Sequence, residues 1–412
     1  MPCITLRYPP ASDYEIDSLL HGVRLVSFPP ITRHCWLTSL VIALVLGVAV
    51  APVCAQSSKD EDWEITPQSE IALRRGLDWL EQNQGAEGNW ESNDLGLVAM
   101  GALAFMAAGH TPGKGRYGKA VEKAIDYILR NQKPSGLLNI SNEQRDMYNH
   151  GLATFVLGQA HGMTGDPRIN AGLDRALKLI ANTQCEDGGW DYKAARQKNG
   201  HDLSLAVMQA KALRSAVDSG LEVPPEVIDQ AIRSVREHYC PVDGRRDVPE
   251  SEQMKQPGQF TYGKGGGGGT VAMAAAGVVC LQEFGQYEDW RIPKSMSFVS
   301  ASIQKLGRRK GRDGHLPFDA YTLYYVGQAL YQVGGPTWRE NYPLLRDSLV
   351  DSQVSERSGS KDAGKWDSSG HVGGRPGELY GTAVGCFILA IPNRYLPILQ
   401  EGRIEGFKKA GN

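Results

Sequence analysis

The sequence predicts an all-α protein: a single (α/α)6 toroid, or barrel, of six helical hairpins with an inner and an outer layer of helices. Helices with one apolar stripe alternate along the chain with helices that are apolar almost all round. A Gly-rich turn at the end of the striped helices recurs about every 54 residues. Because a helix that is apolar all round must be covered on several sides, a closed ring in which each hairpin buries its neighbour's apolar face satisfies the pattern.

The striped helices are expected in the outer layer, because one apolar face at spacings of three and four leaves the other face in water. Their stripes fall at Leu73, Leu77 and Leu80; Val121, Ile125 and Ile128; Leu173, Leu177 and Ile180; and Val227, Ala231 and Val235. Two weaker members end near residues 304 and 353. The inner helices are expected around residues 97–106, 152–157, 203–207, 271–281, 323–330 and 382–391.

The composition of the 412 residues is that of a globular chain, with 41% hydrophobic and 22% charged residues and a net charge of −2. These values exclude a disordered, collagen-like or polytopic membrane protein. They also supply no overall positive field, so we expect no nucleic-acid partner.

The first 55 residues are predicted to be a leader with a secretory signal peptide. An uncharged stretch, 37–53, follows Arg33 and ends in Val53, Cys54 and Ala55 before Gln56, which is typical of a signal cleavage site. We therefore expect an exported protein, in the periplasm, the cell envelope or the medium. The alternative is that 37–53 stays as a membrane anchor, which would then be its only membrane contact. Residues 56–68 are predicted as a linker, 69–400 as the toroid and 401–412 as a C-terminal tail.

Four cysteines remain after removal of the leader, too few for a disulfide scaffold. Cys280 and Cys386 lie in apolar helical stretches and are expected to be free thiols. Cys185 and Cys240 occupy matching places in neighbouring repeats, so that a single bridge between them is compatible with an exported protein. Both the bridged and the free state of this pair are left open.

Two turns carry a Gln followed six residues later by a Trp, at Gln84 and Trp90 and at Gln184 and Trp190, and Gln353 with Trp366 is a degraded copy. This spacing resembles the QW motif of the prenyltransferase and squalene-oxidase repeat family, which includes the squalene cyclases. The resemblance covers residues 69–400 and implies one squalene cyclase-like, terpenoid cyclase-like α/α toroid. The Gln amide is expected to bond orphan groups at a helix end and to tie the outer helix to the next inner helix.

The chemistry motifs of that family are missing from this chain. It has no DxDD run for protonating an alkene, no DDxxD for magnesium, no Asp-x-Cys zinc ligands and no GCGEQ thioester. We therefore expect no metal and no cofactor, and the protein is predicted to be non-cyclising. Whether it is an enzyme of another type stays open.

Polar and aromatic residues gather where the inner helices are predicted to begin. If the ring closes, they converge on one mouth of the toroid and form a candidate ligand site: Asp94, Tyr148, Asn149, His150, His201, Asp202, Thr270, Asp319, Tyr321, Tyr324, Tyr325, Glu378 and Tyr380. Each of the three Asp residues is alternatively a simple N-cap. The two His residues lack a zinc-binding spacing, which favours a hydrogen-bonded structural role.

Three functions are compatible with these features. The first is an exported, non-cyclising toroid that binds a small apolar (isoprenoid), peptide or glycan ligand at the mouth. The second is an enzyme, either a divergent terpenoid cyclase with an isolated Asp or a carbohydrate-active toroid with two carboxylates about 5 to 10 Å apart. The third is an envelope scaffold protein with a filled centre.

Overall fold

A computed structural model describes residues 63–266, 269–306, 314–355, 361–367 and 377–400. The predicted leader, the alternative anchor at 37–53 and the C-terminal tail lie outside these ranges. Contacts divide the chain into Met1–Ser57 and Ser58–Asn412, and every described residue belongs to the second unit.

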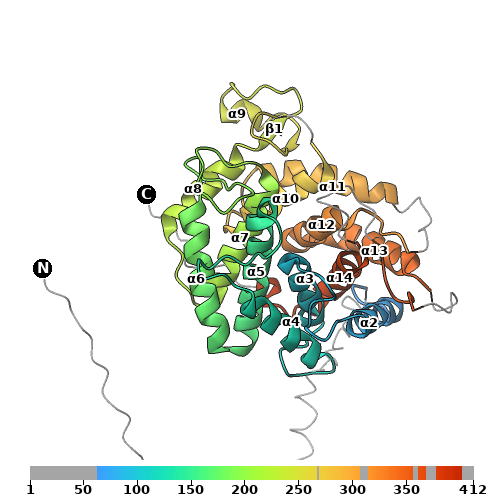
Figure 1. Ribbon diagram of the computed structural model, residues 1–412. Coiled ribbons are helices and arrows are strands. Elements are labelled where there is room, and N and C mark those ends of the chain that lie inside the picture. The colour runs from blue at the N-terminus through green and yellow to red at the C-terminus, as the bar shows by residue number, and fades with distance from the viewer. Residues whose placement is uncertain (1–62, 267–268, 307–313, 356–360, 368–376, 401–412) are drawn as a thin grey trace, which may run out of the picture. The chain divides into compact units, whose positions relative to one another are not determined.

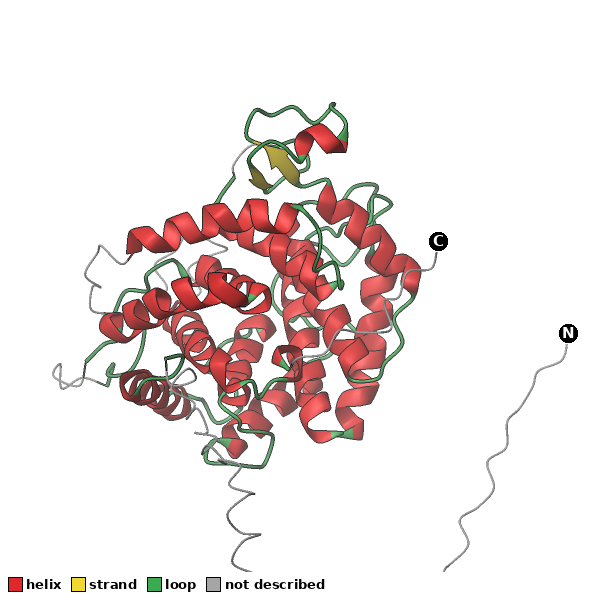
Figure 2. Cartoon of the chain, turned by 180° about the vertical axis from the view of Figure 1, so that it is seen from behind, coloured by secondary structure: helices red, strands yellow, loops and turns green. Residues whose placement is uncertain are grey.

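The described chain is a succession of long helices in two layers (Figures 1 and 2). The outer helices are α2 (Pro67–Gln82), α4 (Gly118–Arg130), α6 (Pro167–Thr183), α8 (Pro225–Arg236), α11 (Arg291–Leu306) and α13 (Gly335–Ser352). The inner helices are α3 (Leu95–Ala107), α5 (Asp146–Thr164), α7 (Leu203–Asp218), α10 (Val271–Glu283), α12 (Ala320–Val333) and α14 (Gly377–Ala390). Short elements are η1 (Glu143–Arg145), α9 (Glu250–Gln253), η3 (Ile391–Asn393) and η4 (Pro397–Leu399), and β1 (Tyr239–Pro241) pairs antiparallel with β2 (Gly258–Phe260).

The inner helices form a closed ring, which confirms the predicted all-α toroid. Along the chain α3, α5, α7, α10, α12 and α14 each pack on the next, and α14 packs on α3. Outer helices lie over the grooves between inner ones, as α4 does on α3 and α5, and α2 covers the seam between α14 and α3. The sequence pattern explains the layers, since every residue of α3 except Leu97 is buried, whereas α4 buries only one face.

Four outer helices are followed within two residues by a Gln whose amide joins them to the next outer helix, an arrangement we call the Gln clamp. The Nε2 group donates to a Gly carbonyl in its own turn and to a carbonyl of the following outer helix. The partners are Gly88 and Ala120 for Gln84, Gly136 and Gly172 for Gln132, Gly188 and Val227 for Gln184, and Gly364 and Ala72 for Gln353, at 2.8 to 3.3 Å. The expectation that the Gln joins an outer to an inner helix is therefore wrong, because both acceptors lie in the outer layer or its turns.

The Trp of the motif makes the connection between layers. The indole Nε1 of Trp90 donates to the Leu80 carbonyl at 2.8 Å, and Trp190 and Trp366 repeat this bond to Ile180 and Leu349. The ring of Trp90 packs on α3, where a Cβ added to Gly101 would lie 2.6 Å from it. Each Trp therefore satisfies an orphan carbonyl near the end of its outer helix.

A left-handed Gly in the same turn lets the backbone approach the next outer helix. Gly188 has a φ of +83°, and a Cβ there would lie 2.2 Å from the Gln230 carbonyl oxygen of α8. Gly88 repeats this geometry against Lys123 of α4, with a φ of +88°. Only Gly satisfies both the positive φ and the close contact.

The possible Cys185–Cys240 bridge is wrong, because both cysteines are free. Cys185 is buried in the turn after α6, where its N–H donates to the Gly189 carbonyl at 2.8 Å. Cys240 instead lies in β1, part of an insertion between α8 and α10 that projects from one edge of the ring (Figure 1). The fourth repeat thus forms a hairpin where the third forms a Gln clamp, and the two places do not match.

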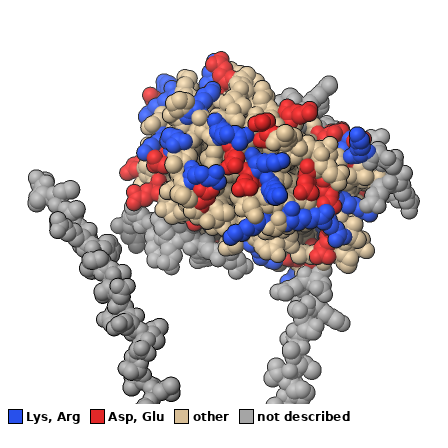
Figure 3. All heavy atoms as spheres, turned by 60° about the horizontal axis from the view of Figure 1, so that its bottom comes forward, with Lys and Arg blue, Asp and Glu red and all other residues tan. Residues whose placement is uncertain are grey.

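Part of the predicted linker is packed against the toroid. Glu64 accepts a hydrogen bond from the Trp338 indole at 2.6 Å and pairs with Arg394 at 3.0 Å. Ordered packing therefore begins before residue 69. Acidic and basic side chains are interspersed on the face shown in Figure 3. Within the described ranges no helix has the length and apolar character needed to cross a membrane.

Replacing Gln184 with Ala should lower the free energy of unfolding by about 2 kcal/mol, because two buried carbonyls each lose the hydrogen bond from the amide. Urea denaturation measures the change. Gln304→Ala is the matched control, since Gln304 is exposed and makes one long bond to Asn341, and it should cost under about 0.5 kcal/mol. Equal effects of the two substitutions would contradict the Gln clamp.

Gly188→Ala should cost more than about 3 kcal/mol, because the new Cβ would collide with the Gln230 carbonyl. Gly220 also has a positive φ, +77°, but nothing lies within 4 Å of an added Cβ, so Gly220→Ala should cost only about 1 kcal/mol. Thermal and urea unfolding of the two variants separates the cost of the steric contact at residue 188 from the cost of backbone strain, which both variants share. A Gly188→Ala protein as stable as Gly220→Ala would refute the close approach of the two outer helices.

Candidate functional site

All inner helices begin at the same end of the ring, and we call that end the mouth. The N-cap alternative is confirmed for three Asp residues. Asp94 accepts from the Leu97 N–H at 3.1 Å, Asp202 from Ser204 at 2.8 Å and Asp319 from Thr322 at 3.1 Å. Thr270 caps α10 in the same way. These bonds hold polar side chains from four different hairpins around one opening.

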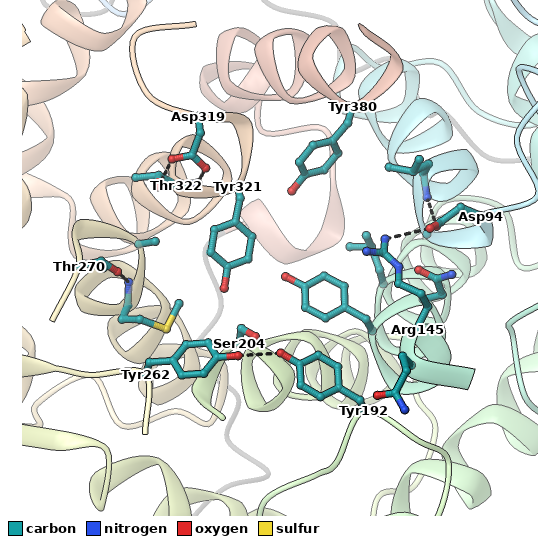
Figure 4. Close-up of a pocket in the computed structure, with 18 of the residues that line it drawn as sticks. Asp94, Arg145, Tyr192, Ser204, Tyr262, Thr270, Asp319, Tyr321, Thr322 and Tyr380 are labelled. Carbon is teal, nitrogen blue, oxygen red and sulfur yellow. Dashed lines mark hydrogen bonds and ion pairs between the residues drawn. The ribbon is translucent and has the colours of Figure 1, made fainter. Parts of the chain in front are cut away.

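A cavity of about 930 Å³ opens at the mouth between the inner helices (Figure 4). Seven of the predicted residues line it: Asp94, Tyr148, Asn149, Thr270, Asp319, Tyr321 and Tyr380. The sequence did not single out its other members: Gly96, Leu97, Gln144, Arg145, Leu152, Tyr192, Ser204, Tyr262, Gly263, Gly266, Ala272, Met273 and Thr322. The wall therefore combines aliphatic side chains with five tyrosines.

One ion pair crosses the rim between α3 and η1. Arg145 lies 2.9 Å from Asp94, and its guanidinium also lies over the Tyr148 ring, 5.7 Å from the ring centre. Arg145 is the only Lys or Arg among the described residues of the lining. The carboxylates of Asp94 and Asp319 lie on opposite sides of the cavity, and the Tyr380 ring extends between them (Figure 4).

Tyrosine hydroxyls face the interior of the cavity. Those of Tyr321 and Tyr380 point toward its centre in Figure 4, and the Tyr148 hydroxyl lies 3.2 Å from that of Tyr325. Burial raises the pKa of Tyr148, Tyr321 and Tyr380 well above the usual 10. At neutral pH these groups are protonated, uncharged hydrogen-bonding groups.

Asp202 does not line the cavity but lies behind Tyr192 and Ser204, with its side chain wholly buried. Its carboxylate accepts from the Tyr192 hydroxyl at 2.7 Å, from His201 Nδ1 at 2.9 Å and from both the N–H and the hydroxyl of Ser204. Burial alone would raise the pKa of Asp202, but these hydrogen bonds outweigh it and hold the pKa below its usual value. Asp202 is therefore a carboxylate at neutral pH.

The other candidates are also placed away from the cavity. His150 is buried, accepts from the Leu138 N–H at 3.1 Å and bonds the Ala176 carbonyl, as the structural alternative predicted. His201 is half exposed, with its ring edge on Tyr192. Tyr324 and Tyr325 are buried below the lining, and Glu378 pairs with Lys365. In the part of the chain that the structure describes, no three His, Cys, Asp or Glu side chains could hold a metal ion together.

Two tyrosines of the wall come from loops. Tyr192 lies two residues after Trp190, in the segment that leads to α7, so the QW turn was a signal that could have found it. Tyr262 follows β2 in the insertion, and its hydroxyl lies 2.7 Å from that of Tyr192. No periodic pattern marks Tyr262, because the insertion interrupts the repeats.

No family model matches the chain. A stretch of 157 residues, 37% of the chain, is 29% identical to drimenyl diphosphate synthase of Streptomyces showdoensis and spans only 27% of that protein.

Several solved structures align with most of the chain. A sugar epimerase from a ruminal bacterium aligns with a TM-score of 0.52 and 13% identity over 80% of this chain and 99% of the epimerase. An inactive variant of an α-1,6-mannanase of Salegentibacter sp. HEL1_6, in complex with α-1,6-mannotetrose, aligns at 0.50 and 9% identity over 82% of this chain and all of the mannanase. A type II terpene cyclase from Scytonema, with geranylgeranyl dihydroxybenzoate, aligns at 0.49 and 13% identity over 80% of this chain and 98% of the cyclase.

The alignments with the epimerase and the mannanase, over about four fifths of this chain, show that the fold described above occurs in solved structures. At these identities the solved structures establish the fold alone. The specific repeat family suggested by the QW spacing stays a prediction.

Protein stability should fall on acidification because two buried His residues have lowered pKa values. Burial lowers the pKa of His150 and of His238 to about 4, from 6.5. The unfolded chain then binds more protons between those values, so stability is full above about pH 6.5 and declines as the pH falls toward 4. Between pH 7.5 and pH 5 each His should remove about 2 kcal/mol.

Urea denaturation across this range measures the slope, and His150→Gln should reduce it by about half relative to the parent protein. A slope unchanged by that substitution would show that His150 is not held neutral in the fold.

Proposed function

We propose that the protein binds a neutral, mainly apolar ligand of isoprenoid size in the cavity at the mouth, without cyclising it. The observation that carries the proposal is the lining: aliphatic groups and protonated tyrosines around a single cation that already has an acidic partner. The volume of about 930 Å³ lies in the range of small-molecule sites, about 300 to 1,000 Å³. A filled centre, as a pure scaffold would have, does not fit this cavity.

The charges favour a neutral ligand over a diphosphate. A buried anionic head group needs cations or a metal around it. Here Arg145 is paired with Asp94, and Asp319 adds a further negative charge on the opposite wall. A diphosphate would therefore meet more acidic than basic groups in this lining.

The carboxylates of the site also support binding without cyclisation. Protonation of an alkene requires a carboxylic acid that carries its proton, whereas Asp202 is held as a carboxylate by its donors. Asp94 accepts from Arg145 and a backbone N–H, and Asp319 accepts from the N–H and hydroxyl of Thr322. Both oxygens of each of these carboxylates therefore already accept a hydrogen bond from the protein.

A glycan-active enzyme is the second candidate. Asp94 and Asp319 lie on opposite sides of the cavity (Figure 4), and a pair of carboxylates on either side of the substrate is the usual requirement of glycoside hydrolysis. An α/α toroid of similar fold has been seen with a mannotetrose. Tyrosine faces and hydroxyls also suit sugar rings.

We further propose that the protein is exported, which rests on the apolar stretch 37–53 and the small residues before Gln56. The intact mass of the protein purified from its host measures this directly. A chain that begins at Gln56 is expected, and a mass that includes residues 37–53 would favour the anchored alternative.

The ligand proposal predicts that native mass spectrometry of protein from its own host will detect a bound apolar molecule. Leu97→Trp should lower the occupancy of that molecule, because Leu97 lines the cavity from α3 and the larger indole would take part of the space of the ligand. Leu221→Trp is the matched control, since Leu221 lies in a separate groove beside α8, and it should keep the ligand. Unchanged occupancy in the Leu97→Trp protein would place the ligand elsewhere, and a bound oligosaccharide would favour the second candidate.

A further inference from the structure

The hydrogen-bond pattern around Asp202 fixes the direction of neighbouring hydroxyl groups. An ionised carboxylate only accepts hydrogen bonds, so every polar group in contact with it must donate. Asp202 is surrounded by the Tyr192 hydroxyl, His201 Nδ1, and the N–H and hydroxyl of Ser204. All of these protons are therefore directed away from the cavity, toward a single buried group.

The direction of hydrogen-bond donation that Asp202 sets continues along the cavity wall to Tyr262. Because Tyr192 gives its proton to Asp202 at 2.7 Å, its oxygen is an acceptor toward Tyr262, whose hydroxyl lies 2.7 Å away. Tyr262 thus donates toward Tyr192 and the Asp202 carboxylate behind it, and the remaining lone pairs of its oxygen are left for the cavity. Tyr262 is 41% exposed, so that its oxygen is accessible to a ligand.

Ser204 follows the same rule. Its hydroxyl donates to Asp202, so the serine oxygen acts only as an acceptor toward the cavity, where the Tyr321 hydroxyl also bonds to it. Two neighbouring oxygens of this wall are therefore acceptors. A ligand carbonyl or ether in front of them would face lone pairs and could bond Tyr262 only if the Tyr262–Tyr192 bond were broken.

We propose that the ligand carries a hydroxyl group, which donates its proton to the Tyr262 oxygen while the apolar body occupies the rest of the cavity. The ligand is thus expected to be an apolar alcohol. This inference rests on the proposed function, because it specifies the ligand of the same cavity. Asp202 is the positioning residue: it contacts no ligand and sets which partner Tyr262 recognises.

The preference for an alcohol follows from one hydrogen bond. At Tyr262 an alcohol keeps the Tyr262–Tyr192 bond and adds a new one, whereas an acceptor-only ligand of the same skeleton must exchange one for the other. The hydroxyls of Tyr321 and Tyr380 can donate to all of these ligands alike, since an alcohol oxygen also accepts. A net difference of one neutral hydrogen bond corresponds to roughly 3- to 10-fold in affinity.

Titration calorimetry of the full protein with farnesol, its methyl ether and the aldehyde farnesal tests the proposal, because the three probes differ only at the head group. Farnesol should bind roughly 3- to 10-fold more tightly than either analogue. Asp202→Asn should bring the three affinities together, because an alcohol oxygen accepts a hydrogen bond just as an ether or aldehyde oxygen does. Asn keeps the N-cap through its side-chain oxygen, but its NH₂ group donates to Tyr192, which then donates to Tyr262 and turns the Tyr262 proton toward the cavity.

Two further variants keep the test independent of folding. Tyr262→Phe removes an exposed hydroxyl and should abolish the preference for the alcohol while the apolar body still binds. Asp166→Asn is the matched control: Asp166 caps the outer helix α6 through the Arg168 N–H, so this change repeats the cap chemistry away from the cavity and should leave the order of the probes unchanged.

Equal binding of alcohol, ether and aldehyde to the parent protein would overturn the inference and leave the proposed function in place. An order of probes that Tyr262→Phe does not alter would also overturn it. Binding of none of the three would overturn the proposed function and the inference together.

Discussion

The structure depends on the hydrogen bonds by which one outer helix holds the next. An inner helix such as α3 is apolar on all sides and cannot be covered by its own hairpin. Each Gln clamp places two carbonyls on one amide, and the left-handed Gly beside it allows the backbone to touch the following helix. The indole of Trp90 then ties the outer helix to the inner layer. The last clamp, from Gln353 to Ala72, joins the end of the ring to its beginning.

The periodicity of apolar residues was enough to predict two layers, the order of the helices and the closed ring, because these follow from which faces must be buried. The partner of the Gln amide was assigned to the wrong layer, since a sequence motif names a donor but not the carbonyl that it reaches. The expectation of a disulfide was wrong for a related reason. The insertion after α8 replaces a turn by β1, so Cys240 does not occupy in its repeat the position that Cys185 has in the preceding one.

The mouth was predictable in part because inner helices of a toroid all begin at one end, and Asp or Thr at those positions follows from capping. That rule found Asp94, Asp319 and Thr270. It could not separate residues that face the cavity from those one turn deeper, such as Tyr324, or from those behind the wall, such as Asp202. The capping role also explains why acidic residues surround a cavity that holds no free cation among its described lining. A site with this balance of charge favours neutral molecules, and its directed hydroxyl groups select among them.

Ring closure is the claim on which both the cavity and its ligand rest. Amide hydrogen exchange of α2 in a Gln353→Ala protein tests it most directly, because Gln353 is bonded to the Ala72 carbonyl across the seam. A closed ring predicts faster exchange in α2 than in the parent protein, although the substitution lies in the last hairpin, with α6 unaffected. Unchanged exchange in α2 would indicate an open arc, whose first and last hairpins do not touch, and would contradict the account.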